Sequence, residues 1–167
     1  MSYSKREINR VKLSKIIFIA NGILEAFNLP GFSGGDVRFI EIGKRWQRKG
    51  AEIHVITSRA GVKLCKDMGL NANFHISDRA RALGEISYIK RALTIPLSAK
   101  IKERLTKAVV YSTSDLLCDV LPAVRLKKVL GTKWVATFHW LEDPPWRRGL
   151  KFGITWIKGL LLCLNQY

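Results

Sequence analysis

The order of apolar and polar positions along the chain predicts strands that alternate with helices. A β-branched run at residues 16–20 precedes a loop rich in glycine, proline and asparagine, and a helical pattern then ends at Lys49 and Gly50. Within that pattern Phe39 and Trp46 fall on one side, with a period of about 3.6 residues. A second β-branched run follows at Glu52–Thr57. This order predicts two parallel neighbouring strands, with the helix packed on one face of their sheet.

The remainder of the chain repeats this alternation. Further strands are expected at residues 73–76, 108–111 and 133–139, and further helices at 61–68 and 120–130. Residues 79–107 have helical character with a break at Pro96, and they carry much of the positive charge. Asp119 is expected to cap the 120–130 helix, which places Pro122 in its first turn, where proline is tolerated.

Together these elements predict an α/β fold with a Rossmann-like parallel sheet and helices on both faces. Residues 1–14 form a basic N-terminal arm, and residues 15–167 form one domain. The tail after residue 150 has a helical pattern that combines cationic and apolar faces, which is typical of helices at a membrane surface and also of helices that dock on a sheet. Its apolar part is too short to span a bilayer.

The loop between the first strand and the first helix, residues 21–35, is longer than the roughly two to six residues usual at this position. It contains Asn28, Leu29, Pro30 and Gly31, which have the composition of a turn. Such a loop opens at the carboxyl edge of the sheet, where parallel α/β folds bind ligands. The following helix is expected to be capped by Ser33 or Asp36.

The charge balance narrows the choice of partners. The chain has 29 lysine and arginine residues against 13 aspartate and glutamate residues, a net charge of +16. That field favours membrane headgroups, nucleic acid or sugar-nucleotide phosphates. Nucleic acid is disfavoured, because no recognised nucleic-acid motif is present and the aromatic residues fall mostly at buried-type positions. Three widely spaced cysteines indicate a reducing compartment, so a cytoplasmic location is expected.

Several segments resemble family 4 glycosyltransferases. Ser33-Gly34-Gly35, with Arg38 on the next helix turn and residues 49–57, is similar to the start of that family. Residues 109–126 resemble its fourth strand and the helix after it, and residues 134–139 resemble its fifth strand, which ends in a histidine. The order and spacing of these segments carry the resemblance, which covers most of the chain. It implies the N-terminal, acceptor-side half of a GT-B fold, incomplete at its C-terminus.

The resemblance also implies an activity. Such an enzyme is a retaining glycosyltransferase that moves a sugar from a nucleotide-diphosphate sugar to an acceptor hydroxyl, with no metal or other cofactor. The donor-binding domain of the family has no counterpart in this sequence, so we expect a fragment or one subunit of a split enzyme, inactive alone. The positive charge suggests a lipid-linked acceptor and a peripheral position at the inner face of the membrane. The alternative is a non-catalytic basic binding module or subunit at a membrane surface.

His139 is the candidate catalytic residue, because it ends a predicted strand and the family's histidine at this position lies near the transferred sugar. The alternative is a strand-end histidine whose ring bonds to a nearby carbonyl group. His54 and His75 fall inside strand patterns and are expected to be structural. No spacing typical of metal ligands occurs.

The candidate substrate-binding residues lie at the start of the first helix and the end of the fourth strand. Gly34 and Gly35 are expected to offer backbone N–H groups to the donor diphosphate or to the acceptor, or else to form an ordinary turn. Arg38 either reaches a phosphate group or is a solvated surface residue. Ser112 and Thr113 either bind the acceptor or cap the following helix.

Overall fold

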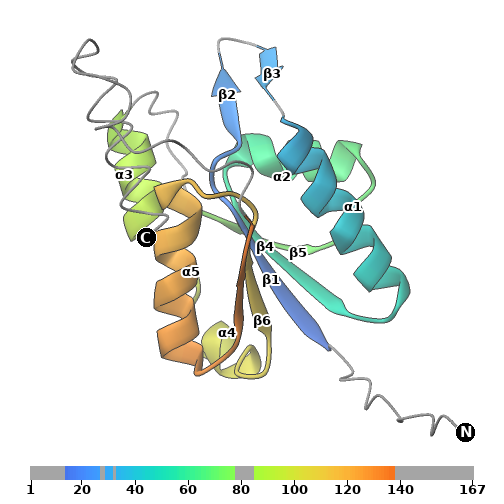
Figure 1. Ribbon diagram of the computed structural model, residues 1–167, viewed down its shortest axis with the longest axis vertical. Helices are drawn as coiled ribbons and strands as arrows, with labels where there is room; N and C mark the ends of the chain where they lie inside the picture. Colours follow the sequence, from blue (N-terminus) through green and yellow to red (C-terminus); the bar gives the residue numbers. More distant parts are fainter. Residues whose placement is uncertain (1–13, 27–28, 32, 78–84, 138–167) are drawn as a thin grey trace, which may run out of the picture.

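The computed structural model describes residues 14–26, 29–31, 33–77 and 85–137 (Figure 1). Its centre is a parallel sheet of β1 (Lys15–Ala20), β4 (Glu52–Thr57), β5 (Asn73–Ile76), β6 (Val109–Ser112) and β7 (Trp134–Ala136). The strands lie in the order β5-β4-β1-β6-β7, with β1 at the centre. The predicted Rossmann-like α/β fold is therefore confirmed.

Helices cover both faces of this sheet, as predicted. Helices α1 (Gly34–Arg48) and α2 (Arg59–Asp67) pack on one face, and α4 (Ala99–Arg104) and α5 (Leu117–Leu130) pack on the other. Helix α3 (Glu85–Leu93) lies beside α5 (Figure 1). Strand β1 contributes to both cores because its side chains alternate: Phe18 packs against Phe39 of α1, whereas Ile17 and Ile19 join the core beneath α5.

The carboxyl ends of β1 and β6 are neighbours at the point where the strand order reverses. In the register of the two strands, Ile19 lies opposite Ser112. From β1 the chain runs outward through β4 to β5, and it then crosses to β6 on the other side of β1. In open α/β sheets the connections diverge at such a point and leave a crevice where ligands bind.

The segment after β1 contains an antiparallel hairpin of β2 (Leu24–Ala26) and β3 (Leu29–Gly31). The turn expected at residues 28–31 is therefore wrong, because residues 29–31 form a strand. Pro30 pairs with Glu25 in a two-stranded ribbon, where each strand has a free edge and a missing N–H group is tolerated. Figure 1 shows that the hairpin projects beyond the carboxyl edge of the main sheet.

Helix α5 begins earlier than predicted, and Asp119 does not cap it. The cap position is Leu116, which has no side-chain hydrogen bond to the helix. Asp119 lies inside the first turn and is only 1% exposed, because its carboxyl group bonds to the chain after β1 instead. Pro122 consequently lies beyond the first turn of the helix, contrary to the prediction.

The other boundaries agree closely with the sequence pattern. Strands β4 and β5 have the predicted limits, and Ser112 ends β6 rather than starting the following loop. Helices α3 and α4 are separated by the stretch that contains Pro96. The basic arm, the pattern after residue 150 and the end of the predicted 133–139 strand lie outside the described residues.

The contact between α2 and β4 gives a stability prediction. A methyl group on Gly61 would overlap Thr57 Oγ1, whose hydroxyl group donates to the Ala20 carbonyl at 2.6 Å. We expect Gly61→Ala to lower the free energy of unfolding by about 1–3 kcal/mol in urea denaturation. Gly34→Ala is the control, since a methyl group there meets no atom within 4 Å. An equal loss in both variants would contradict the packing.

Candidate functional site

Asn21, the first residue after β1, is a fully buried junction at the carboxyl edge of the sheet. Its side-chain oxygen accepts a hydrogen bond from Ser77 Oγ at 2.6 Å, after β5. Its side-chain amide donates to the Cys118 carbonyl of α5 at 3.0 Å. Its backbone carbonyl accepts from Arg91 Nη1 of α3 at 2.6 Å. One residue thus connects the ends of two strands with two helices.

The carboxyl group of Asp119 completes the junction from α5. One oxygen accepts from the backbone N–H groups of Asn21 and Gly22, at 2.5 Å and 3.1 Å. The other accepts from the Ser114 hydroxyl and lies 3.3 Å from Thr113 Oγ1. Burial raises the pKa of Asp119 to about 7, although the hydrogen bonds from Ser114, Asn21, Gly22 and Thr113 oppose that rise.

The hydroxyl group of Thr113 lies between Asp119 and the end of β1. This hydroxyl has one hydrogen and lies 2.9 Å from the Ile19 carbonyl, closer than it lies to Asp119. Its single hydrogen can be donated to the Ile19 carbonyl or to the Asp119 carboxylate, so Thr113 links the end of β1 to α5. Because Asp119 is almost fully buried, it positions the chain after β1 rather than touching a ligand.

The proline inside α5 supplies one acceptor of this junction. Pro122 has no N–H group, so the Cys118 carbonyl one turn earlier lacks its usual helical partner. The side-chain amide of Asn21 donates to that carbonyl instead. In the sequence, the local signals at the two ends are Asn21-Gly22 directly after a strand and Asp119 three residues before a proline, and neither signal reveals that the two ends pair.

The two hydroxyl residues expected to bind the acceptor are buried. Ser112 is 0% exposed, and its Oγ accepts from Trp134 Nε1 at 3.2 Å. Thr113 is 4% exposed and donates to Ile19 of the neighbouring strand. Both side chains therefore hold β6 to its neighbours, and the half-buried Ser114 is the hydroxyl residue nearer the surface of this loop.

Gly34 and Gly35 lie in the first turn of α1, at the carboxyl edge (Figure 1), and Arg38 follows one turn after Gly34. The helix begins with a capping box: Asp36 N donates to Ser33 Oγ at 3.3 Å, and Ser33 N donates to the Asp36 carboxylate at 2.7 Å. In the described part of the chain, the N–H groups of Gly34 and Gly35 have no acceptor. Gly34 and Arg38 are exposed, so this turn is open to a ligand.

His139, the candidate catalytic residue, lies outside the described residues, as does the basic tail. In residues 14–26, 29–31, 33–77 and 85–137, no three histidine, cysteine, aspartate or glutamate side chains are grouped as metal ligands. The helices described in those ranges are all too short or too polar to cross a membrane.

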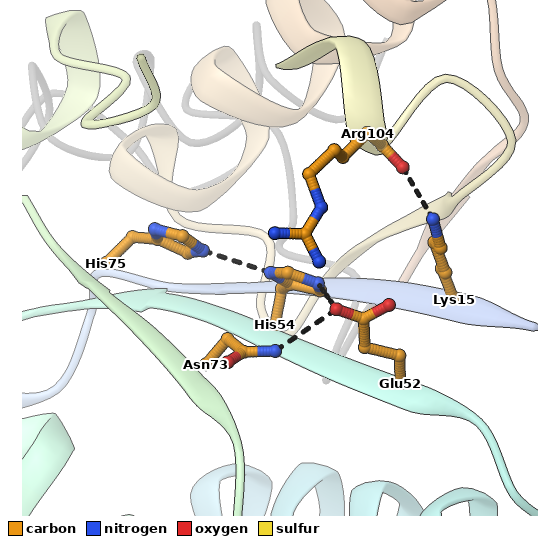
Figure 2. Close-up of polar contacts among 6 residues, drawn as sticks. All are labelled: Lys15, Glu52, His54, Asn73, His75 and Arg104. Carbon is orange, nitrogen blue, oxygen red and sulfur yellow. Dashed lines mark hydrogen bonds and ion pairs between the residues drawn. The ribbon is translucent and has the colours of Figure 1, made fainter. Parts of the chain in front are cut away.

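A second polar cluster joins β4 and β5 (Figure 2). His54 Nδ1 lies 3.1 Å from His75 Nε2, and the two ring planes differ by 6°. His54 Nε2 lies 3.0 Å from Glu52 Oε1, which also accepts from Asn73 Nδ2 at 3.3 Å. Since the carboxylate accepts from His54 Nε2–H, a neutral His54 presents Nδ1 as an acceptor, and His75 donates to it.

Both histidines favour the neutral form in the folded protein. Burial lowers the pKa of His54; its hydrogen bond to Glu52 opposes this, while the cationic Lys15 and Arg104 lower the pKa further. Burial, and then the nearby His54, lower the pKa of His75 to about 4. Figure 2 shows Arg104 on the same side of the sheet as the rings. The cluster therefore acts as a neutral bridge between the two strands, as expected for structural histidines.

No protein-family model matches the chain, and comparisons with curated proteins and with solved structures give no match either. The class of protein is therefore defined by its own geometry. It is a Rossmann-like parallel α/β domain with a buried polar junction at the switch point of its sheet and an open helix turn at the same edge.

Asp119→Asn should preserve the hydrogen bonds of the junction and change how the free energy of unfolding depends on pH. An amide can accept from the two backbone N–H groups and donate to the hydroxyl oxygens of Ser114 and Thr113. In the wild type, the stability contributed by the protonated carboxyl group is complete below pH 3.8 and is lost as the pH rises through about 7. Urea denaturation should therefore show the variant gaining stability relative to the wild type across that range.

Asp119→Ala is the contrasting variant. It leaves the N–H groups of the buried Asn21 and the half-buried Gly22 without this acceptor, and we expect it to lower the free energy of unfolding by about 2–4 kcal/mol. If the alanine and asparagine variants have the same unfolding free energy, the hydrogen bonds of Asp119 do not hold the junction.

The contribution of His75 to stability changes with pH in the opposite direction to that of Asp119. Because the pKa of His75 is lowered in the folded state, its contribution to stability is present above the ordinary value of 6.5 and is lost as the pH falls through about 4. His75→Gln cannot titrate but can still donate to His54. It should lose less stability than the wild type between pH 6.5 and 4, by about 1 kcal/mol after solvent screening. Parallel pH curves for the two proteins would contradict this.

Proposed function

We propose that this chain is the acceptor-side domain of a retaining glycosyltransferase that uses a nucleotide-diphosphate sugar and is similar to family 4. The observation that carries the proposal is the open first turn of α1, with the exposed Gly34 and Arg38, at the carboxyl edge of the sheet. The sheet order supports it, since such sheets bind ligands at that edge. The resemblance of Ser33-Gly34-Gly35 to the start of that family supplies the reaction class.

In this proposal α1 stabilises the leaving diphosphate. The N–H groups of Gly34 and Gly35, which have no acceptor among the described residues, lie at the positive end of the helix dipole, and Arg38 adds a cation one turn after Gly34. These groups stabilise the negative charge that develops as the bond between sugar and diphosphate breaks. The sugar passes to an acceptor hydroxyl oxygen with retained configuration, and His139 is the proposed residue near the transferred sugar.

The buried junction has a supporting role in this proposal. Asp119 fixes Asn21 and Gly22, which begin the connection from β1 through the hairpin to α1. A ligand on the first turn of α1 meets N–H groups whose positions depend on that connection. Asn21 and Asp119 are therefore positioning residues, and the first turn of α1 makes the contacts.

A single substitution can test the diphosphate contact. Gly34 occupies the first helical position, where proline is favoured, and Ser33 already has the extended backbone that precedes proline, with ψ of 165°. Gly34→Pro therefore removes one open N–H group while keeping the helix start. We expect it to weaken binding of uridine or guanosine diphosphate about tenfold, measured by NMR chemical-shift titration.

Gly34→Ala is the matched control, because it keeps the N–H group and its methyl group meets no atom within 4 Å. It should bind the diphosphates like the wild type. If the proline and alanine variants bind equally well, or if the signals of Gly34 and Gly35 do not shift, the proposed contact is wrong. Sustained sugar transfer by the isolated chain, from radiolabelled nucleotide sugars, would contradict its assignment to the acceptor side alone.

A further inference from the structure

Large aliphatic side chains are exposed on two neighbouring helices. Ile89 and Leu93 of α3 are 54% and 52% exposed, and Val129 of α5 is 59% exposed. Ile89 and Leu93 are one turn apart and therefore share a side of their helix. We call Ile89, Leu93 and Val129 the aliphatic stripe.

The structure aligns the two halves of the aliphatic stripe. Arg125 Nη1 of α5 donates to the Leu93 carbonyl of α3 at 2.9 Å, which holds the end of α3 beside the middle of α5. Val129 lies one turn after Arg125 on the same side of α5. Figure 1 shows the two helices side by side on the outer surface of the domain. The two helices that carry the stripe are therefore held together at Leu93 and Arg125.

Cationic side chains flank the stripe. Lys90, Arg125 and Lys128 are exposed. Asp119 is the acidic residue of α5 and is buried, and Glu85, the first residue of α3, lies one turn before Ile89. Three cations, Lys90, Arg125 and Lys128, outnumber this one carboxyl group, so the net charge beside the stripe is positive and complements an anionic partner.

We propose that the aliphatic stripe and its cationic flanks bind the surface of an anionic lipid bilayer. Aliphatic side chains enter the boundary between headgroups and acyl chains, while lysine and arginine side chains pair with anionic headgroups. This inference does not rest on the proposed glycosyl transfer, because none of the residues that would contact lipid has a role in that reaction.

Two other partners fit these observations less well. Single-stranded nucleic acid is held by aromatic side chains that stack on bases, and the large apolar side chains that are exposed in the described residues are all aliphatic. A second copy of this chain packed face to face would bring Lys90, Arg125 and Lys128 against the same cations. A bilayer satisfies both the aliphatic and the cationic groups.

The bilayer surface would be rigidly linked to the candidate site. Helix α3 is anchored by Arg91, which is 2% exposed and donates to the Asn21 carbonyl at the end of β1. The face of α3 that carries Leu93 is thus fixed relative to the carboxyl edge of the sheet. Binding a bilayer through α3 holds that edge at a defined position above the lipid.

Vesicle co-sedimentation of the full chain tests the contribution of the aliphatic stripe to lipid binding. The wild type should bind vesicles of phosphatidylcholine with phosphatidylglycerol and should not bind phosphatidylcholine alone. We expect Ile89→Ser with Leu93→Ser to weaken this binding about tenfold. Val135→Ser removes a comparable apolar side chain, 45% exposed on β7, and should bind like the wild type. Equal loss in both proteins would overturn the proposal.

Two double variants that remove the same charge test the contribution of the cationic side chains to lipid binding. Lys90→Gln with Lys128→Gln should weaken binding about fivefold for each charge removed. Lys63→Gln with Lys107→Gln removes the same net charge from exposed positions on α2 and after α4, and should have a much smaller effect. If the two pairs bind equally weakly, net charge alone drives binding. If the stripe variants no longer bind single-stranded RNA but still bind the vesicles, the partner is nucleic acid. Either result overturns the proposal.

Discussion

The carboxyl group of Asp119 binds the two backbone N–H groups that follow β1, and the carboxyl edge of the sheet is built around that contact. Where β1 ends, Asn21 and Gly22 leave the sheet ladder while Asn21 remains fully buried. Each buried N–H group without an acceptor would cost about 1–3 kcal/mol. One carboxyl oxygen of Asp119 accepts from both N–H groups, and the burial of that carboxyl group raises its pKa to about 7.

The side chain and the carbonyl of Asn21 connect this contact to other elements of the domain. Its side chain bonds to Ser77 after β5 and to Cys118 of α5, and its carbonyl bonds to Arg91 of α3. The chain beyond Gly22 runs through the hairpin to the open turn of α1, where we propose that a diphosphate binds. Helix α3, fixed by Arg91, carries part of the proposed lipid-binding surface. Both proposals thus depend on elements that meet at one junction.

The sequence pattern predicts the sheet well, because each face of a central parallel strand is buried and its residues are correspondingly apolar. The first turn of α1 is also predictable, since its capping residues are neighbours in the chain. The role of Asp119 is not, because its backbone partner Asn21 lies 98 residues earlier and composition does not reveal such pairs. The burial of Ser112 was missed for a similar reason: it depends on Trp134 of a neighbouring strand.

Amide hydrogen exchange measured by NMR tests this junction most directly. The N–H groups of Asn21 and Gly22 should exchange as slowly as those of the buried strand β1, although both residues lie outside the sheet ladder. The open N–H group of Gly34 provides a fast-exchanging reference within the same molecule. If Asn21 and Gly22 exchange as fast as Gly34 in the folded protein, their hydrogen bonds to Asp119 are absent, and the central constraint described above is contradicted.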